Sequence, residues 1–388
     1  MSDAPRVSIV TRTRNRPVLL RRAIASALSQ TMPSWEMLIV NDGGEAAPVD
    51  ELVAAVADTA RDRIRVIHNA VNRGMEAASN LALSHATGEF VVIHDDDDSW
   101  EPEYLAACVG HLDGADSGVE GVVTASTRIV ERLDGDTVTI VASEPYGNPL
   151  QSITLLEMAR GNMFPPIAFL YRRAVLASIG SYRADLPVLG DWEFNLRFLA
   201  EYEIDAITRP LANYHIRPDT TTGVYSNTVV GGISLHQKYA ARLRNELLRD
   251  DMRRGRSGLG FLVNMARMLN DQLWEMRRGH VFDRALGRLR GQGVVSLAVY
   301  GAGALCRQVI ISAQSLGLHV QCVVDRNAAI WGTDIEGVDV MGLDAALDRG
   351  CDTFLIASVT YAREMRATID TAAKARGTTV KIAEIDPV

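Results

Sequence analysis

Four short apolar runs near the start of the chain limit its fold more than any other sequence feature. A stretch with a helical apolar face follows the first run, near residues 18–30, and another precedes the last run, near residues 76–85. Alternation of strands and helices predicts an α/β fold with a mostly parallel, doubly wound sheet. The four predicted strands are Val7–Thr11, Met37–Val40, Ile64–Ile67 and Phe90–Ile93.

The fourth predicted strand leads directly into His94 and four consecutive aspartates, Asp95 to Asp98. Two like charges ~4 Å apart repel by about 1 kcal/mol in water and about 4 kcal/mol at an effective dielectric constant near 20. A divalent cation would remove this repulsion, because Mg²⁺ binds to one or two carboxylates together with substrate phosphates. The alternative is an acidic, solvated loop before a helix that begins near Pro102.

Polar residues after the other strands favour the first interpretation. Thr13 and Asn15 follow the first strand, Asp42 follows the second and Asn72 follows the third. Because parallel strands end at the same edge of a sheet, these side chains should lie close to the acidic run. The sequence therefore predicts a site for a metal ion and a diphosphate at this edge.

Four phrases resemble those of the family 2 glycosyltransferases, in that family's order and at similar spacing, across roughly residues 5–220. They are Thr-Arg-Asn-Arg-Pro, Val-Asn-Asp-Gly-Gly, Asn-Arg-Gly and Gly-Glu-Phe-Val-Val-Ile-His-Asp-Asp-Asp-Asp-Ser-Trp-Glu-Pro. The resemblance implies a GT-A nucleotide-sugar-binding fold, a Mn²⁺ or Mg²⁺ cofactor and, in most members, inversion at the anomeric carbon. The sequence departs from the family at Arg14, where an aromatic residue is usual, and at Ser79, where an arginine is common.

The resemblance also implies roles for individual residues. Asp42 would accept the N3–H of a uracil or thymine base, because an ionised carboxylate only accepts hydrogen bonds; an Asx turn with Gly43 is the alternative. Asp95 would lie near the ribose, and Asp97 would bind the metal. The implied residues for binding the donor nucleotide are Thr13, Asn15, Asp42, Asn72, Asp95 and Asp96.

The segment Leu189–Phe198 resembles the family's acidic motif at the start of a helix that faces the acceptor. Direct displacement needs a base for the acceptor hydroxyl, and Asp191 matches that base, with Glu193 as the second candidate. A helix N-terminus lowers a carboxyl pKa, so we expect an ionised Asp191, which also suits a helix cap. His215 is a candidate metal ligand or else a surface residue.

Composition excludes several classes of protein. The net charge is −8 and the pI is near 5.6, which argues against a nucleic-acid-binding protein. The four cysteines are scattered, without the spacing of a zinc site. We expect a cytoplasmic protein, because we find no signal-peptide core and no apolar run of the ~18 residues that a membrane span needs.

The chain is long enough for several domains, and we predict a GT-A domain at residues 1–228, a helical connector at 229–290 and a smaller Rossmann-like α/β domain at 291–388. Residues 241–290 hold 12 arginines and 6 acidic residues. This basic stretch suits peripheral contact with an anionic membrane or a lipid-linked acceptor, or else a solvated face and a homodimer contact.

The last predicted domain begins with a strand at Leu297–Tyr300, followed by Gly301 and Gly303, and Asp325 lies 22 residues after Gly303. The dinucleotide-binding pattern is incomplete because Cys306 stands where the third glycine belongs. We therefore predict an accessory domain in a glycosyltransferase whose acceptor is a glycan, a lipid-linked sugar or a small molecule. A sugar-nucleotide oxidoreductase and a non-catalytic binding protein are the two alternatives.

Overall fold

The computed structural model describes residues 4–147, 152–218, 220, 223–226, 233–303, 305–358 and 361–384. The chain divides into two compact units, Met1–Arg267 and Met268–Val388. Helices α10 (Ile233–Arg254) and α11 (Leu259–Gly291) occupy most of the predicted helical connector. The predicted domain boundaries after residues 228 and 290 stay predictions.

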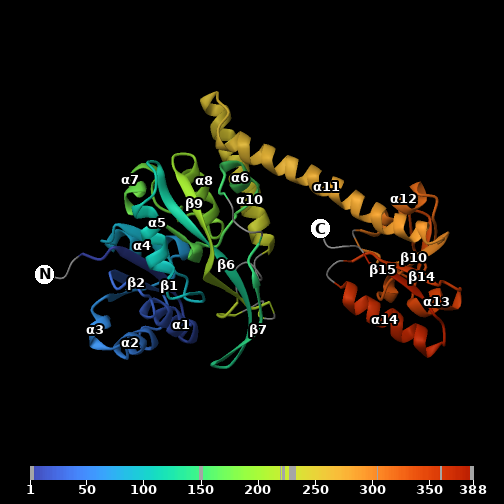
Figure 1. Cartoon of the computed structure of the whole chain (residues 1–388), viewed down its shortest axis with the longest axis horizontal. Coiled ribbons are helices and arrows are strands. Elements are labelled where there is room, and N and C mark those ends of the chain that lie inside the picture. The colour runs from blue at the N-terminus through green and yellow to red at the C-terminus, as the bar shows by residue number, and fades with distance from the viewer. Residues whose placement is uncertain are drawn as a thin grey trace. The chain divides into compact units, whose positions relative to one another are not determined.

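One mixed sheet of nine strands forms the framework of the first unit. Figure 1 labels β1, β2, β6, β7 and β9 among them. The strand order is β3-β2-β1-β4-β8-β6-β9-β5, with β7 paired to β6. Strands β3, β2, β1 and β4 are parallel, β8 is antiparallel to both of its neighbours, and β6 and β9 are parallel. The strands are β1 (Val7–Thr13), β2 (Trp35–Asp42), β3 (Ile64–Asn69), β4 (Phe90–Ile93), β5 (Ser99–Trp100), β6 (Val119–Asp134), β7 (Thr137–Pro145), β8 (Phe169–Arg172) and β9 (Glu203–Ile216).

The four strands predicted from the apolar runs are confirmed. Ile9, Val10, Ile39 and Val92 are fully buried. Successive residues of a strand point to opposite faces of the sheet, so the burial of both Ile9 and Val10 means that both faces of β1 are covered. This mixed α/β architecture, with its large, parallel-rich sheet, is a GT-A fold.

Helices cover this sheet and begin close to the predicted positions. Helix α4 packs against β1 and β2, and α5 packs against β6. The helix expected at Pro102 begins at Tyr104, because the short strand β5 precedes it and pairs with β9. The helices are α1 (Pro17–Leu28), α2 (Ala47–Ala54), α3 (Asp58–Arg61), α4 (Met75–His85), α5 (Tyr104–Asp113), α6 (Leu155–Arg160), α7 (Leu176–Ile179) and α8 (Gly190–Leu199), with short 3-10 helices η1 (Pro166–Ala168) and η2 (Arg173–Val175).

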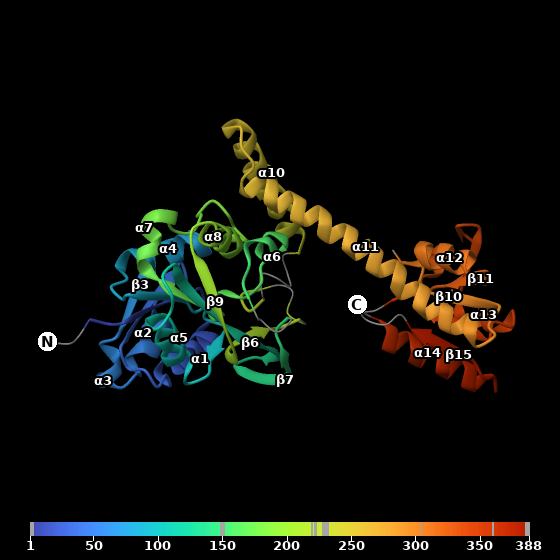
Figure 2. The ribbon, with the colours of Figure 1, turned by 45° about the horizontal axis from the view of Figure 1, so that its top comes forward.

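The second unit is built on a smaller sheet of six strands in the order β12-β13-β11-β10-β14-β15. All neighbours are parallel except β12 and β13. Helices α12 and α14 lie on opposite faces of this sheet, as Figures 1 and 2 both show. The elements are β10 (Ser296–Tyr300), α12 (Cys306–Ser315), β11 (His319–Val324), η3 (Ala328–Ile330), β12 (Asp334–Ile335), β13 (Val338–Met341), α13 (Leu343–Asp348), β14 (Thr353–Ile356), α14 (Ala362–Ala375) and β15 (Lys381–Glu384).

The turn after β10 contains both predicted glycines. Gly301 has a φ of 110°, in the region that favours glycine, and the Asp325 carboxylate accepts a hydrogen bond of 2.8 Å from the Ala302 backbone N–H. The Asp325 carboxylate therefore contacts the backbone of this turn. A Rossmann-like accessory role for the unit stays a prediction.

Candidate functional site

A cavity of about 360 Å³ opens at the edge of the large sheet where β1, β2 and β4 end. It lies in the range of about 300–1,000 Å³ that is typical of sites for small ligands. The parallel pairing of β1 with β2 and β4 brings the polar residues after each strand to this edge. The lining residues are Arg12, Thr13, Arg14, Arg16, Asp42, Asn72, Gly74, Met75, Ala78, Asp95, Asp97, Asp98, Pro187, Tyr214 and Ser226.

The Asp42 carboxylate lines this cavity and also holds the loop before α4. It accepts hydrogen bonds from Asn69 Nδ2 (2.8 Å) and from the backbone N–H groups of Arg73 (3.0 Å) and Gly74 (2.9 Å). Two carboxylate oxygens offer about four acceptor sites, so Asp42 retains capacity to accept from a ligand. Asn72, which also lines the cavity, accepts from the Gly74 N–H at 2.9 Å.

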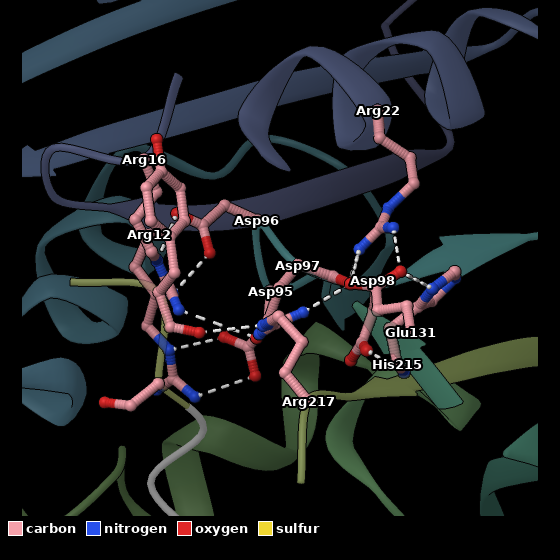
Figure 3. Close-up of polar contacts among 12 residues, drawn as sticks. Arg12, Arg16, Arg22, Asp95, Asp96, Asp97, Asp98, Glu131, His215 and Arg217 are labelled. Carbon is pink, nitrogen blue, oxygen red and sulfur yellow. Dashed lines mark hydrogen bonds and ion pairs between the residues drawn. The ribbon is translucent and has the colours of Figure 1, made fainter. Parts of the chain in front are cut away.

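Arginines from other elements face the acidic run, as Figure 3 shows. Arg12 Nε donates to Asp95 at 2.7 Å, and Arg16 Nε donates to Asp96 at 3.1 Å. Arg217, which follows β9 and is fully buried, forms an ion pair with the Asp97 carboxylate. The repulsion that we expected a divalent cation to remove is therefore offset by guanidinium groups of the chain itself.

Three carboxyls of the run respond differently to this environment. Burial raises the pKa of Asp96 to about 6, although Arg16 opposes that shift. Burial, and after it the charge of Asp97, raises the pKa of Asp98 well above its ordinary value. Burial would also raise the pKa of Asp97, but Arg16 and Arg217 outweigh it, so this pKa is lowered. Asp97 is thus the buried carboxyl of the run that is held as an anion.

His215 lies behind this run, among buried polar groups. Its Nδ1 is 2.8 Å from a carboxylate oxygen of Glu131, and its Nε2 is 2.9 Å from the Ser99 hydroxyl. The backbone N–H of His215 donates to Asp98 at 2.9 Å. Since both ring nitrogens hold partners and the residue is outside the cavity lining, the structure does not place His215 as a ready metal ligand.

Two residues that we expected at the nucleotide lie outside the cavity lining. The Asn15 side chain accepts a hydrogen bond of 2.8 Å from the Glu45 N–H and so connects two loops. Asp96 is fully buried beside Arg16. Thr13, Asp42, Asn72, Asp95 and Asp97 do line the cavity.

Asp191 is in the first turn of α8. One carboxylate oxygen accepts from Asn162 Nδ2 at 2.7 Å, and the other accepts from the Trp192 N–H at 2.8 Å. Burial raises the pKa of Asp191 above its ordinary value, which outweighs the lowering by the Trp192 N–H and Arg12. The expectation that the helix N-terminus would lower this pKa was wrong, because loss of solvation is the larger effect.

The start of α8 packs directly on another carboxyl. A Cβ on Gly190 would lie 2.3 Å from Oε1 of Glu76, a residue of α4 that is 5% exposed. Burial raises the pKa of Glu76 to about 7, Arg12 opposes the shift, and the charge of Asp191 adds to it. The two carboxyls therefore act on each other electrostatically across the contact between α4 and α8.

Glu193, the second candidate for the base, has a different environment. It is 5% exposed and receives two hydrogen bonds of 2.8 Å from Arg197, four residues later on the same helix. Arg197 also donates to the backbone carbonyl of Ser181 at 2.9 Å. This ion pair ties α8 to the preceding loop.

Sequence reasoning missed several charged residues of this site. Arg12 is in β1, and Arg16 follows that strand. Both arginines are close in sequence to Thr13, at the sheet edge where the site was predicted, so the sequence could have indicated them. Glu131 is inside the long strand β6, is 2% exposed, and carried no signal. Among the residues that the structure describes, no group of three or more His, Cys, Asp or Glu side chains is arranged to hold a metal ion.

Comparisons with known proteins agree with the fold. Residues 8–180 match the model of the family described as glycosyl transferase family 2. The colanic acid biosynthesis glycosyl transferase WcaA of Escherichia coli K12, whose assignment is putative, is 39% identical over 112 residues, which cover 29% of this chain and 39% of WcaA. The glycosyltransferase EpsH of Bacillus subtilis 168, likewise putative, is 26% identical over 306 residues, which cover 76% of this chain and 83% of EpsH.

Two solved structures match part of this chain at low sequence identity. Staphylococcus aureus TarS 1–349 in complex with UDP-GlcNAc has a TM-score of 0.44 and 19% identity, and the match covers 55% of this chain and 59% of that one. The mannosyltransferase PcManGT from Pyrobaculum calidifontis, in complex with GDP-Man and Mn²⁺, has a TM-score of 0.45 and 20% identity, covering 69% and 70% of the two chains.

Proposed function

We propose that the first unit of the chain, whose residues 8–180 match the family 2 model, is a glycosyltransferase domain, and that it moves a sugar from a UDP- or dTDP-activated donor to an acceptor hydroxyl. The observation that carries this proposal is one cavity lined by Asp42 at the end of β2 and by Asp95 and Asp97 after β4. Asp42 accepts the N3–H of the base, Thr13 and Asn72 border the nucleotide, and Asp95 lies toward the ribose.

A Mn²⁺ or Mg²⁺ ion fits the residues of this cavity. Asp95 and Asp97 present hard carboxylate oxygens at its wall, and such ions take one or two carboxylates and complete their shell with phosphate oxygens and water. Asp97 would hold the ion, with Asp95 beside it. The ion would supply stabilisation of the charge on the leaving diphosphate as a Lewis acid.

Arg16 and Arg217 add positive charge at the same place. Both contact Asp97, and Arg16 lines the cavity. A guanidinium group can pair with phosphate oxygens through two parallel hydrogen bonds. We propose that Arg16 turns from Asp97 toward the diphosphate when the donor binds, while Arg217 stays paired with Glu131.

Asp191 is the proposed base. Asn162 and the Trp192 N–H orient its carboxylate, and its raised pKa makes it a stronger proton acceptor than an ordinary aspartate. The acceptor oxygen attacks the anomeric carbon as the bond to the diphosphate breaks, and the hydroxyl proton passes to Asp191. Displacement from the face opposite the diphosphate inverts the anomeric centre, through an oxocarbenium-like transition state.

Glu193 and His215 are not part of this mechanism, because Arg197 and Glu131, respectively, already engage their side chains. We propose that the second unit is an accessory domain, and that α10 and α11 offer a basic surface for a membrane or a second subunit. Among the described residues, no helix has the length and apolar character needed to cross a membrane.

Isothermal titration calorimetry tests the donor site. UDP and dTDP should bind in the presence of Mn²⁺ and lose at least tenfold in affinity with EDTA. Asp97→Ala should remove this metal dependence, and Asp42→Ala should weaken UDP binding with or without metal. Equal UDP affinity with Mn²⁺ and with EDTA would exclude the metal, and tighter binding of GDP than of UDP would exclude the proposed base specificity.

A further inference from the structure

A second cavity of the first unit lies where β6, β7 and β9 meet. Its volume of about 360 Å³ is again in the range of sites for small ligands. Its walls come from the middle of β6, the last residues of β7 and a bulged part of β9. The lining residues are Ala125, Ser126, Thr127, Ser143, Glu144, Pro145, Tyr146, Gly147, Thr208 and Pro210.

Ser126 provides an unusual polar group in this wall. The residue is 6% exposed, and its hydroxyl makes no hydrogen bond within the described part of the chain. A buried hydroxyl without a partner costs about 1–3 kcal/mol, so proteins normally satisfy such groups. Because Ser126 lines the cavity, a molecule bound there can supply the partner.

Tyr146 connects this cavity to the donor cavity. Its backbone N–H donates to the Ser126 carbonyl at 2.9 Å, which fixes the tyrosine at the cavity wall. Its ring makes an edge-to-face contact with Tyr214, with centroids 5.4 Å apart, and Tyr214 lines the donor cavity. Burial raises the pKa of the Tyr146 hydroxyl, and the charges of Asp191 and Asp98 raise it further, so this hydroxyl lies within electrostatic reach of the proposed base.

The walls combine two kinds of chemistry. Ser126, Thr127, Ser143 and Thr208 bring hydroxyl groups, while Tyr146 offers a flat apolar surface, supplemented by two prolines. A saccharide ring has apolar C–H faces and an edge of hydroxyl groups, and it can satisfy both kinds of wall. Glu144 is paired with Arg128, so the cavity presents little uncompensated charge.

We propose that this second cavity is the acceptor subsite and that it binds a neutral saccharide ring, with a ring hydroxyl bonded to Ser126 and a ring face against Tyr146. This inference rests on the proposed glycosyl transfer, and it specifies the acceptor as a saccharide. The reacting hydroxyl would extend past Tyr146 toward Asp191. A free sugar and the sugar end of a lipid-linked glycan share this chemistry.

Saturation-transfer NMR with methyl glycosides of common hexoses, N-acetylhexosamines and 6-deoxyhexoses tests the subsite directly on the full chain. Thr208→Trp places a large side chain at the exposed rim of the cavity, and Ser126→Ala removes the buried hydroxyl. Thr139→Trp is the matched control, because Thr139 is an exposed residue of β7 outside the cavity. UDP affinity, measured with Mn²⁺ on the same samples, reports the donor cavity independently.

At least one methyl glycoside should bind to the wild type, with its signal unchanged by saturating UDP. Thr208→Trp should weaken that binding at least tenfold and Ser126→Ala about fivefold, while Thr139→Trp and the UDP affinities stay within twofold of wild type. The proposal is overturned if no glycoside binds, if Thr208→Trp binds it like the wild type, or if UDP displaces it. Failure of UDP to bind would instead overturn the donor site alone.

Octyl glycosides separate the two sources of acceptor. Binding at least tenfold tighter than that of the methyl glycoside, still lost in Thr208→Trp, would identify a lipid-linked sugar. Equal affinities would identify a free saccharide. Octyl glycoside binding that survives Thr208→Trp would place the saccharide elsewhere and overturn the proposal.

Discussion

Replacing Asp191 by asparagine should separate chemistry from binding. The two side chains have nearly the same shape, but an amide is a far weaker base than a carboxylate. General-base catalysis contributes about 10²–10⁴-fold, so turnover should fall by at least ~10²-fold, which corresponds to about 2.7 kcal/mol of activation free energy. The affinity for UDP should stay unchanged, because Asp191 is outside the lining of the donor cavity.

The same substitution should also lower stability by a modest amount. In the wild type, both carboxylate oxygens accept, one from Asn162 Nδ2 and one from the Trp192 N–H. An amide at position 191 must turn its NH₂ group toward one of these donors. Rotating the Asn162 amide only moves the conflict to Asn195, whose Nδ2 donates to Asn162 at 3.0 Å. Because Asn162 is exposed, water can satisfy part of the unmatched donor, so the cost should lie at the low end of about 1–3 kcal/mol, which thermal unfolding would detect.

The assay measures sugar transfer and UDP affinity for Asp191→Asn, with Glu193→Gln as the matched control. Glu193→Gln should weaken the ion pair with Arg197 and lower the melting temperature, yet keep turnover within tenfold of wild type. The reasoning would be refuted if Asp191→Asn kept more than a tenth of wild-type turnover while Glu193→Gln abolished it.

Further predictions concern stability and its dependence on pH. Gly190→Ala should destabilise the first unit by about 1–3 kcal/mol in denaturant unfolding, because its Cβ would clash with the Glu76 carboxyl. A variant as stable as the wild type would show that α4 and α8 separate readily. Glu76 binds a proton more tightly in the folded chain, with a pKa of about 7, so the free energy of unfolding should fall as the pH rises from 5 to 8. Calorimetry should show a smaller dependence on pH for Glu76→Gln. Equal pH dependence in the two proteins would contradict the assignment. Arg217→Met should cost about 3–5 kcal/mol, because Glu131 and Asp97 would lose a buried cation, and an unchanged melting temperature would show that other cations suffice.

Local sequence patterns were enough to predict much of this molecule. The apolar runs identified the four parallel strands, and helical apolar periodicity identified α1 and α4 near residues 18–30 and 76–85. The predicted strand Leu297–Tyr300 lies within β10 and ends at the same residue. In each case the signal lies within about ten consecutive residues.

The position of Asp42 and the acidic run at one sheet edge followed from the sequence, because parallel strands in a doubly wound sheet all end on the same side. The partners of those carboxylates did not follow. Arg217 is 120 residues from Asp97, and the two meet because β5, just after Asp97, pairs with β9. Glu131 is 84 residues from His215, and they meet because β6 and β9 run side by side. The second cavity depends on the same pairing, since Ser126 and Thr208 come from those two strands.

The sequence by itself determined which residue types gather at the sheet edge, since the strands follow from local apolar runs and parallel strands of such a sheet end on the same side. Only the tertiary structure decided their charge states. Asp191 stands at a helix N-terminus, which alone would lower its pKa, yet burial between α4, α8 and the loop that carries Asn162 raises it. Desolvation depends on all the atoms that surround a group, and those atoms come from segments far apart in the chain.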